Sequence, residues 1–248
     1  MKIQAGDEVL LLGRKSYLVR VGERKFHCEF GTVDLSSLVG AEYGTRVKTH
    51  LGEEFVAVKP WFPDLMKKFR RAPQVVLPKD ASLILAVTGA GRETVVVDAG
   101  AGSGFLAIFL GRYVKKVYTY ERRKDFYEIA SENVRKSGLG NVSVIHGDVR
   151  DCEVSADLVT LDLSEPESVL PRVREILTPG GWVAVFSPFV EQVGKVVEKL
   201  RELSFAGVKT YENILREWGV ETGSRGPSSR PKPYVLHTGF LTFGRKTG

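Results

Sequence analysis

Residues 95–104 read VVVDAGAGSG, and they constrain the fold more than any other stretch of this 248-residue chain. The three valines favour a short buried strand, and an apolar, helix-like segment begins at Phe105. Gly100, Gly102 and Gly104 allow the backbone between them to turn sharply and to approach a ligand closely. The N-terminus of the following helix offers unpaired N–H groups to a carboxylate or a phosphate. The segment therefore predicts a nucleotide-type site at the edge of an α/β sheet.

Strand-like and helix-like segments alternate from residue 94 onward, which predicts an α/β fold with a doubly wound, mostly parallel, Rossmann-like sheet. The expected strands are residues 94–98, 116–121, 142–146, 157–163 and 182–187, and the expected helices are residues 79–87, 104–113, 123–137, 166–177 and 190–203. No helix separates the next two strands, so we expect an antiparallel last hairpin. Its strands are residues 208–214 and 234–243, joined by a loop at 222–233 rich in glycine, proline and serine.

The first part of the chain has a different pattern. Residues 1–60 contain short β-type runs separated by glycines, which predict a small N-terminal β domain. Residues 61–74 form the expected linker, with a short helix that Asp64 caps and that carries four cations. Those cations form either a solvated helix face or a contact with phosphate. The main α/β domain is then expected at 75–248.

Composition limits the class of protein. Apolar residues make up 43% of the chain and charged residues 27%, which is typical of a soluble globular protein. No apolar run approaches the roughly 20 residues that span a membrane, and Asp7 lies where a signal peptide would be apolar. We therefore expect a cytoplasmic protein without membrane contacts. The net charge of +6 permits a polyanionic partner.

The two cysteines, Cys28 and Cys152, lie far apart, so we expect neither a disulfide framework nor a metal site. They are expected to be buried thiols, although a bridge stays open for a hyperthermophile. Asn and Gln occur three times each, and Cys and Met twice each. This depletion of thermolabile residues beside abundant charge is typical of a thermophile.

The glycine spacing differs from that of dinucleotide-binding proteins, in which the third glycine follows the second by three positions. Here Gly100, Gly102 and Gly104 are two apart, and Asp98 stands immediately before the turn. This arrangement suits a ligand whose charged part is an amino acid. Asp98 can reach its ammonium group, directly or through water, and the N–H groups of the loop can face its carboxylate.

Acids recur where each of the next strands ends, and open α/β sheets bind their ligands at this edge. Glu121 follows Asp98 by 23 residues, where a carboxylate can accept both ribose hydroxyls. Asp148 is placed to take the exocyclic amine of an adenine while Val149 packs on its ring. Asp162 ends the fourth strand. Together these residues indicate an acid-lined nucleotide cleft.

This order of motifs resembles the class I S-adenosylmethionine-dependent methyltransferases over residues 75–245. The cationic sulfonium of that cofactor suits an acidic cleft. The resemblance implies that the cofactor S-adenosylmethionine is bound by the following residues: Asp98, Gly100, Gly102, Ser103, Gly104, Glu121, Asp148, Val149 and Asp162.

Flanking segments resemble one family, the tRNA (adenine-N1)-methyltransferases of the TrmI type. These segments are residues 70–80 (RRAPQVVLPKD), 161–166 (LDLSEP) and 230–246 (RPKPYVLHTGFLTFGRK), and residues 38–40 and 43–44 resemble the end of that family's β domain. The resemblance implies methylation of tRNA at position 58 of the T-loop, with position 57 as a further target in some archaeal members. It also implies a homotetramer.

The resemblance carries residue roles onto this chain. Asp162 is retained in the acid motif, in which Ser164 and Glu167 replace the family's usual proline and tryptophan. We expect Asp162 to be catalytic, as the carboxylate beside the N1/N6 edge of the target adenine. Leu77 stands where the family often has an aromatic residue, so here the base would be held otherwise, by apolar packing.

Further tRNA contacts are expected from the segment before the last strand. Arg225, Arg230 and Lys232 lie in the loop near the predicted cleft rim, where cations bind phosphate. His237 and His50 are either structural residues or contacts to RNA. Three rival functions stay open: a methyltransferase for a protein carboxyl group, a non-catalytic tRNA-binding partner subunit, and a nicotinamide-dependent dehydrogenase.

Overall fold

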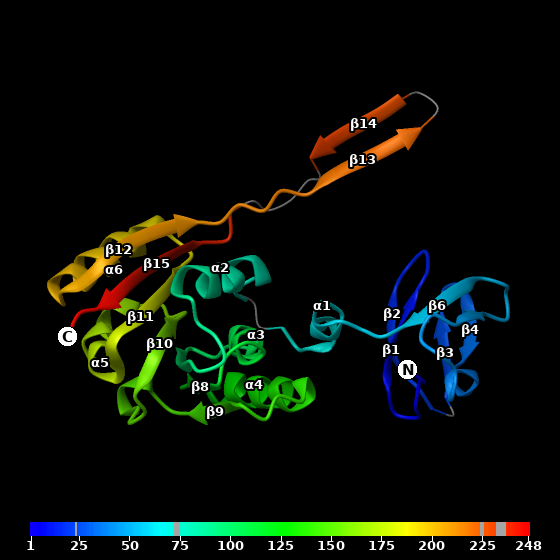
Figure 1. The fold of residues 1–248 in the computed structure, drawn as a ribbon, viewed down its shortest axis with the longest axis horizontal. Coiled ribbons are helices and arrows are strands. Elements are labelled where there is room, and N and C mark those ends of the chain that lie inside the picture. The colour runs from blue at the N-terminus through cyan, green and yellow to red at the C-terminus, as the bar shows by residue number, and fades with distance from the viewer. Residues whose placement is uncertain (23, 72–74, 224–225, 232–236) are drawn as a thin grey trace. The chain divides into compact units, whose positions relative to one another are not determined.

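The computed structural model describes residues 1–22, 24–71, 75–223, 226–231 and 237–248, with side chains except at 221–231. The chain forms two compact units, Met1–Phe69 and Arg70–Gly248 (Figure 1). Each unit is described by itself below. None of the helices in these described ranges is long and apolar enough to cross a membrane.

The first unit is a small antiparallel β structure, as its short apolar runs predict. A four-stranded sheet has the order β2-β1-β6-β5, and β3 and β4 form a separate hairpin. The bounds are β1 Glu8–Leu12, β2 Tyr17–Arg20, β3 Lys25–Cys28, β4 Gly31–Asp34, η1 Leu35–Leu38, β5 Arg46–Lys48 and β6 Glu54–Val58. Val9, Leu11 and Phe55 are buried in its core. The strands β4 and β5 were not predicted, because both are very short and carry polar residues.

The helix expected around Asp64 is shorter than predicted. It consists of α1 (Phe62–Leu65) and the 3-10 turn η2 (Met66–Lys68), so two of the four cations lie beyond it. Asp64 lies inside the first turn and accepts a hydrogen bond from the Trp61 N–H at 3.0 Å. Asp64 therefore caps this helix from its third position, and Trp61 is the N-cap residue.

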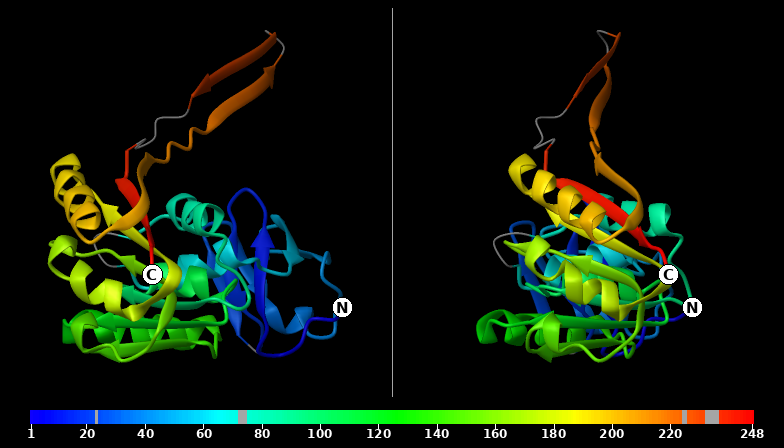
Figure 2. Two further views of the ribbon diagram at one scale, coloured as in Figure 1. Left: turned by 60° about the vertical axis from the view of Figure 1, so that its left-hand side comes forward. Right: turned by 90° about the vertical axis from the view of Figure 1, so that its left-hand side faces the viewer.

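The second unit contains a seven-stranded sheet of order β12-β15-β11-β10-β7-β8-β9. Strands β9, β8, β7, β10 and β11 are parallel, and β15 runs antiparallel to both β11 and β12. Helices flank this sheet (Figure 2). The bounds are α2 Pro78–Thr88, β7 Val95–Ala99, α3 Phe105–Gly111, β8 Lys116–Glu121, α4 Lys124–Ser137, β9 Val142–His146, η3 Val149–Asp151, β10 Ala156–Leu161, η4 Pro166–Ser168, α5 Leu170–Ile176, β11 Leu177–Ser187, α6 Val190–Glu202, β12 Phe205–Glu212 and β15 Phe240–Lys246. This confirms the predicted doubly wound sheet with an antiparallel end.

One part of the last hairpin was predicted incorrectly. The segment expected to be a loop at 222–233 contains strands of its own, β13 (Trp218–Gly223) and β14 (Gly226–Pro231). They pair antiparallel from Trp218↔Pro231 to Gly223↔Gly226 and form a separate two-stranded sheet (Figure 1). Strand β14 consists of glycine, proline, serine and arginine (GPSSRP), so no alternation of apolar side chains predicts it.

Candidate functional site

The predicted acids converge at the carboxyl edge of the sheet. Strands β10, β7, β8 and β9 are consecutive neighbours, so Asp162, Asp98, Glu121 and Asp148 follow one another along this edge. Strand β7 comes first in the chain but lies between β8 and β10, which makes it the topological switch point of the sheet. Open α/β sheets bind ligands in the crevice at this point.

A cavity of about 550 Å³ opens at this edge. Its lining includes six of the residues predicted to bind the cofactor: Gly100, Gly102, Glu121, Asp148, Val149 and Asp162. The lining also includes residues 163–165, 168–169, 188–189 and 192. The predicted acids and the predicted glycine loop therefore meet in one space large enough for a nucleotide.

The glycine loop is fixed by Glu121. Gly102 and Gly104 have φ values of +56° and +79°, in the left-handed region that favours glycine. The Gly102 N–H donates to Glu121 Oε2 at 2.9 Å, and the Arg123 N–H donates to Oε1 at 3.0 Å. A carboxylate oxygen has a second acceptor position, so Glu121 retains the capacity to accept ribose hydroxyls as predicted.

Asp98 lies beneath the cavity and does not line it. Its side chain is buried, and its two oxygens accept hydrogen bonds at 2.6 Å from Thr119 on β8 and Thr160 on β10. Burial raises the pKa of the Asp98 carboxyl to about 6 against the lowering effect of these hydrogen bonds. The structure therefore does not support a direct contact between Asp98 and an ammonium group in the cavity. The Asp98 charge acts on the cavity through its electrostatic effect on Asp162.

Ser103 and Gly104 also support the loop from outside the cavity. The Ser103 carbonyl accepts a hydrogen bond from Asn133 Nδ2 at 2.8 Å, and Gly104 is the residue that precedes α3. A Cβ at Gly104 would lie 3.4 Å from Ala130. These two predicted cofactor-binding residues are thus placed to pack the loop against α4, and neither is among the lining residues.

Asp148 and Val149 lie at the far end of the cavity. Asp148 Oδ1 accepts from the Arg150 N–H at 2.9 Å, and Oδ2 is 3.0 Å from Arg150 Nη1 and 3.5 Å from Arg122 Nη1. The Val149 side chain is buried beside it. An acid held between two arginines next to an apolar side chain suits the edge and face of a purine, and the adenine contact stays a prediction.

Asp162 differs from the other acids. Its N–H donates to the Ala99 carbonyl at 2.7 Å, but its carboxylate accepts no hydrogen bond from the residues that the structure describes. Burial raises the pKa of this carboxyl to about 7, and the charges of Asp98 and Glu121 add to the effect. A half-buried acid with a perturbed pKa and a free carboxylate in a cavity is typical of a functional group.

The residues predicted to contact tRNA are less concentrated. Leu77 is half-buried and does not line the cavity. Arg225 and Lys232 lie outside the described residues, and only the backbone of Arg230 is described, within β14. His50 belongs to the first unit, where its Nδ1 accepts from the Thr32 N–H at 2.9 Å.

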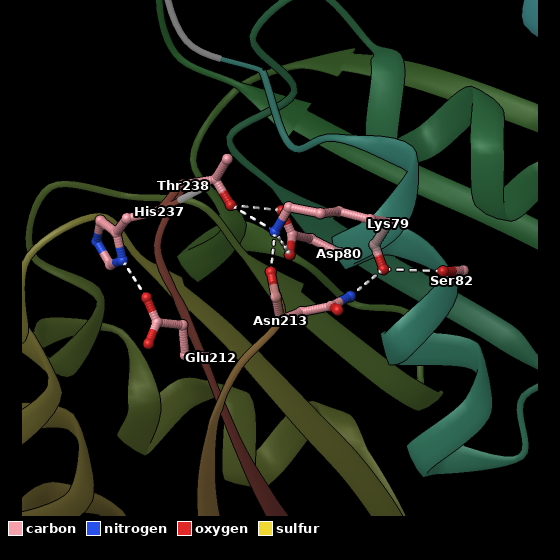
Figure 3. A network of polar contacts seen from close by, with 7 residues as sticks. All are labelled: Lys79, Asp80, Ser82, Glu212, Asn213, His237 and Thr238. Atoms are coloured by element: carbon pink, nitrogen blue, oxygen red, sulfur yellow. Dashed lines mark hydrogen bonds and ion pairs between the residues drawn. The ribbon is translucent and has the colours of Figure 1, made fainter. Parts of the chain in front are cut away.

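His237 lies in a polar network at the base of the β13–β14 hairpin (Figure 3). Its Nδ1 is 2.6 Å from Glu212 Oε1, and its Nε2 is 3.4 Å from the carbonyl of Pro188, a cavity residue. The hydrogen bond with Glu212 raises the pKa of His237. The structure thus gives His237 a structural partner on each side, which favours the structural alternative for this residue.

A buried ion pair completes this network (Figure 3). Lys79 Nζ donates to Asp80 Oδ1 at 2.7 Å, to the Asn213 carbonyl at 2.5 Å and to Thr238 Oγ1 at 2.7 Å. Thr238 Oγ1 in turn donates to Asp80 Oδ2 at 2.9 Å. Asn213 and Thr238 stand on either side of the hairpin in the sequence, so the start of α2 binds both of its ends.

The cavity residues that follow β11 were missed by sequence reasoning. Pro188, Phe189 and Gln192 line the cavity after β11, and Gln192 Nε2 donates to the Ser164 carbonyl at 3.0 Å. The acids were predicted because each follows an expected strand, and these residues likewise follow the strand expected at 182–187. These residues were overlooked because they carry no charge.

Comparison with known proteins shows the relationship. The family described as tRNA methyltransferase complex GCD14 subunit matches residues 59–228, which is more than half of the chain. The chain belongs to this tRNA methyltransferase family. A TrmI tRNA (adenine(57)-N(1)/adenine(58)-N(1))-methyltransferase from Methanocaldococcus jannaschii is 33% identical over 263 residues, covering 93% of this chain and 91% of that protein.

Two solved methyltransferase structures are similar to the whole chain. The tRNA (m1A58) methyltransferase TrmI from Aquifex aeolicus matches with a TM-score of 0.84 and 27% identity over 100% of both chains. An S-adenosylmethionine-dependent O-methyltransferase from Thermotoga maritima matches with a TM-score of 0.90 and 28% identity, over 100% of this chain and 95% of that one.

The cofactor of this family, S-adenosylmethionine, fits the cavity. A Cβ built on Gly102 would meet nothing within 4 Å, so the loop presents bare backbone to open space. Burial raises the pKa values of Asp98 and Asp162, and a cationic ligand bound beside these carboxyls would favour their ionised forms. Glu121, Asp148 and Val149 would hold the nucleoside part, as their positions along the sheet edge predict.

Proposed function

We propose that this chain transfers a methyl group from S-adenosylmethionine to N1 of adenine in the tRNA T-loop, at position 58, with position 57 as a further target. One observation carries the proposal. Among the four acids at the sheet edge, only Asp162 has a carboxylate that accepts no hydrogen bond from the described residues. It is therefore free to bind an incoming base without breaking a contact of the folded protein.

When bound, S-adenosylmethionine supplies a methyl group whose bond to sulfur breaks, leaving the electron pair on sulfur, as the lone pair of adenine N1 forms the new bond. The adenine becomes cationic in this step. The Asp162 carboxylate accepts a hydrogen bond from the exocyclic amine and stabilises the developing positive charge. Adenine in a folded T-loop is stacked, so the base is flipped out to reach Asp162.

The test is methylation of an unmodified tRNA transcript with radiolabelled cofactor, followed by mapping of the modified adenines. We expect label at position 58, position 57 or both. The Asp162→Ala variant is expected to lose most of its turnover and to keep nearly unchanged affinity for S-adenosylmethionine by calorimetry. Equal rates for the variant and the wild type would remove Asp162 from catalysis, and label in protein instead of tRNA would favour the carboxyl-methylating alternative.

The active form is proposed to be a homotetramer that works in the cytoplasm of a thermophile, where its tRNA substrates are. Ile214, Leu215 and Trp218 are 54%, 60% and 53% exposed along the segment that leads into the β13–β14 hairpin. Large exposed apolar side chains that lie close together in the sequence support a surface that a partner covers. Light scattering on the full chain tests the assembly, and a monomeric mass would refute it.

A further inference from the structure

One aromatic side chain at the cavity is left uncovered. Phe189 lines the cavity together with Asp162, yet 64% of it is exposed. The other aromatic lining residues are engaged: Tyr120 is buried, and the Arg123 guanidinium lies 4.0 Å from the centre of the Phe126 ring. Among the described residues, no aromatic ring or cation packs on the Phe189 ring in this way.

The backbone that presents Phe189 is held on both sides. On one side, the Pro188 carbonyl accepts from His237 Nε2 at 3.4 Å. On the other, the Phe189 carbonyl accepts from the Gln192 N–H at 3.2 Å, and the Gln192 side chain donates to the Ser164 carbonyl at 3.0 Å. The ring is therefore carried by an ordered turn that is hydrogen-bonded to the segment containing Asp162.

Phe189 and Asp162 also leave the sheet at the same edge. Strands β10 and β11 are parallel neighbours in which Leu161 pairs with Val185. Asp162 follows Leu161 directly, and Phe189 follows Val185 by four residues. The part of the cavity lining that follows β10 and β11 thus combines the aromatic face of Phe189 with the acceptor oxygens of Asp162. The residues expected to bind the cofactor nucleoside follow β7, β8 and β9.

We propose that Phe189 is a substrate-binding residue on which the flipped target adenine stacks while Asp162 contacts its N1/N6 edge. This inference rests on the proposed function, because it requires a purine as the methyl acceptor. Enzymes that act on flipped bases stack them on aromatic or apolar side chains. Removing one stacking aromatic lowers affinity by about 5- to 150-fold, so the loss is measurable.

The experiment compares Phe189→Ala and Phe189→Trp with the matched control Val190→Ala. Val190 is adjacent, is 61% exposed and does not line the cavity. Methylation of the unmodified tRNA transcript is measured at saturating S-adenosylmethionine, with the cofactor Kd determined by calorimetry. We expect Phe189→Ala to lose about 10- to 100-fold in kcat/KM. Phe189→Trp is expected to stay within threefold of wild type, and all cofactor Kd values to remain unchanged.

A second readout follows the base itself. A transcript with 2-aminopurine at the target position is titrated with each protein. Its fluorescence in the complex with Phe189→Ala is expected to differ from that with wild type, and its fluorescence with Val190→Ala is expected to match wild type. The proposal is overturned if Phe189→Ala behaves like Val190→Ala, or if it changes the oligomeric mass, which would make Phe189 a subunit contact. Absence of tRNA methylation by the wild type would instead refute the proposed function.

Discussion

Replacing Asp162 with asparagine is expected to stabilise the second unit at high pH and to leave its stability unchanged at low pH. The pKa of this carboxyl is 3.8 in an exposed reference state and about 7 in the folded protein. Between these values the folded state binds the proton more tightly, so wild-type stability is full below about pH 4 and falls as the pH rises through 7. Asparagine has no charge to bury and escapes this loss.

The magnitude follows from the same numbers. One pKa unit corresponds to about 1.4 kcal/mol, so the difference between 3.8 and about 7 sets a ceiling of about 4 kcal/mol above pH 7. Asp162 is only half-buried at the cavity wall, and water that reaches its carboxylate reduces the penalty. We expect Asp162→Asn to gain about 2 kcal/mol over wild type at pH 8.

The assay is native-state amide hydrogen exchange in β7 and β10 at several pH values between 4 and 8. It reports the second unit alone, which matters because a chain with two compact units need not unfold in one step. The control is Asp151→Asn, which changes an exposed acid in η3. A difference between Asp162→Asn and wild type that is the same at pH 4 and pH 8 would refute the reasoning.

Three further predictions concern the same unit. Asp162 must be ionised to accept a hydrogen bond from the adenine amine, so kcat/KM for tRNA is expected to fall up to tenfold per pH unit below the carboxyl pKa of about 7. The kcat/KM of Asp162→Asn is expected to be low and independent of pH over the same range. Glu121→Gln is expected to weaken S-adenosylmethionine binding at least tenfold in calorimetry, since it removes a charged acceptor of two backbone N–H groups, whereas Glu165→Gln on the same cavity is expected to change little. Thr238→Val removes a partner of the buried ion pair and is expected to speed hydrogen exchange in the β13–β14 hairpin, whereas Thr210→Val, on β12 and outside that network, is expected not to.

The sequence was sufficient for the parallel strands and for the acids that follow them. Strand Val95–Ala99 begins with three β-branched valines and is followed by glycines, so its strand character can be read from the local sequence. The burial of the Asp98 side chain cannot be read from the local sequence in the same way. Its burial depends on the register that sets Thr119 and Thr160 opposite it on two neighbouring strands. Strand register across parallel neighbours is set by tertiary packing, which a single sequence does not display.

Features without charge or periodicity were the ones overlooked. Strand β14 lacks apolar alternation, and it is paired with β13 through backbone groups. Phe189 lies at the same carboxyl edge of the sheet as the acids. It was not predicted as a site residue because it carries no carboxylate. The ion pair of Lys79 with Asp80 depends on Asn213 and Thr238, more than 130 residues further along the chain.

The arrangement of the acids explains why only one of them suits the methyl acceptor. Asp98 and Glu121 use both oxygens to bind threonines and backbone N–H groups, so moving either would release the glycine loop or the strands beneath it. Asp148 is paired with arginines. Burial raises the pKa of Asp162 to about 7, and the negative charges of Asp98 and Glu121 add to this effect. The hydrogen-bonded acids therefore set the electrostatic field of the cavity. Asp162, whose carboxylate accepts no hydrogen bond from the described residues, is the acid that can bind the incoming base. It follows β10, and Phe189 follows the neighbouring parallel strand β11.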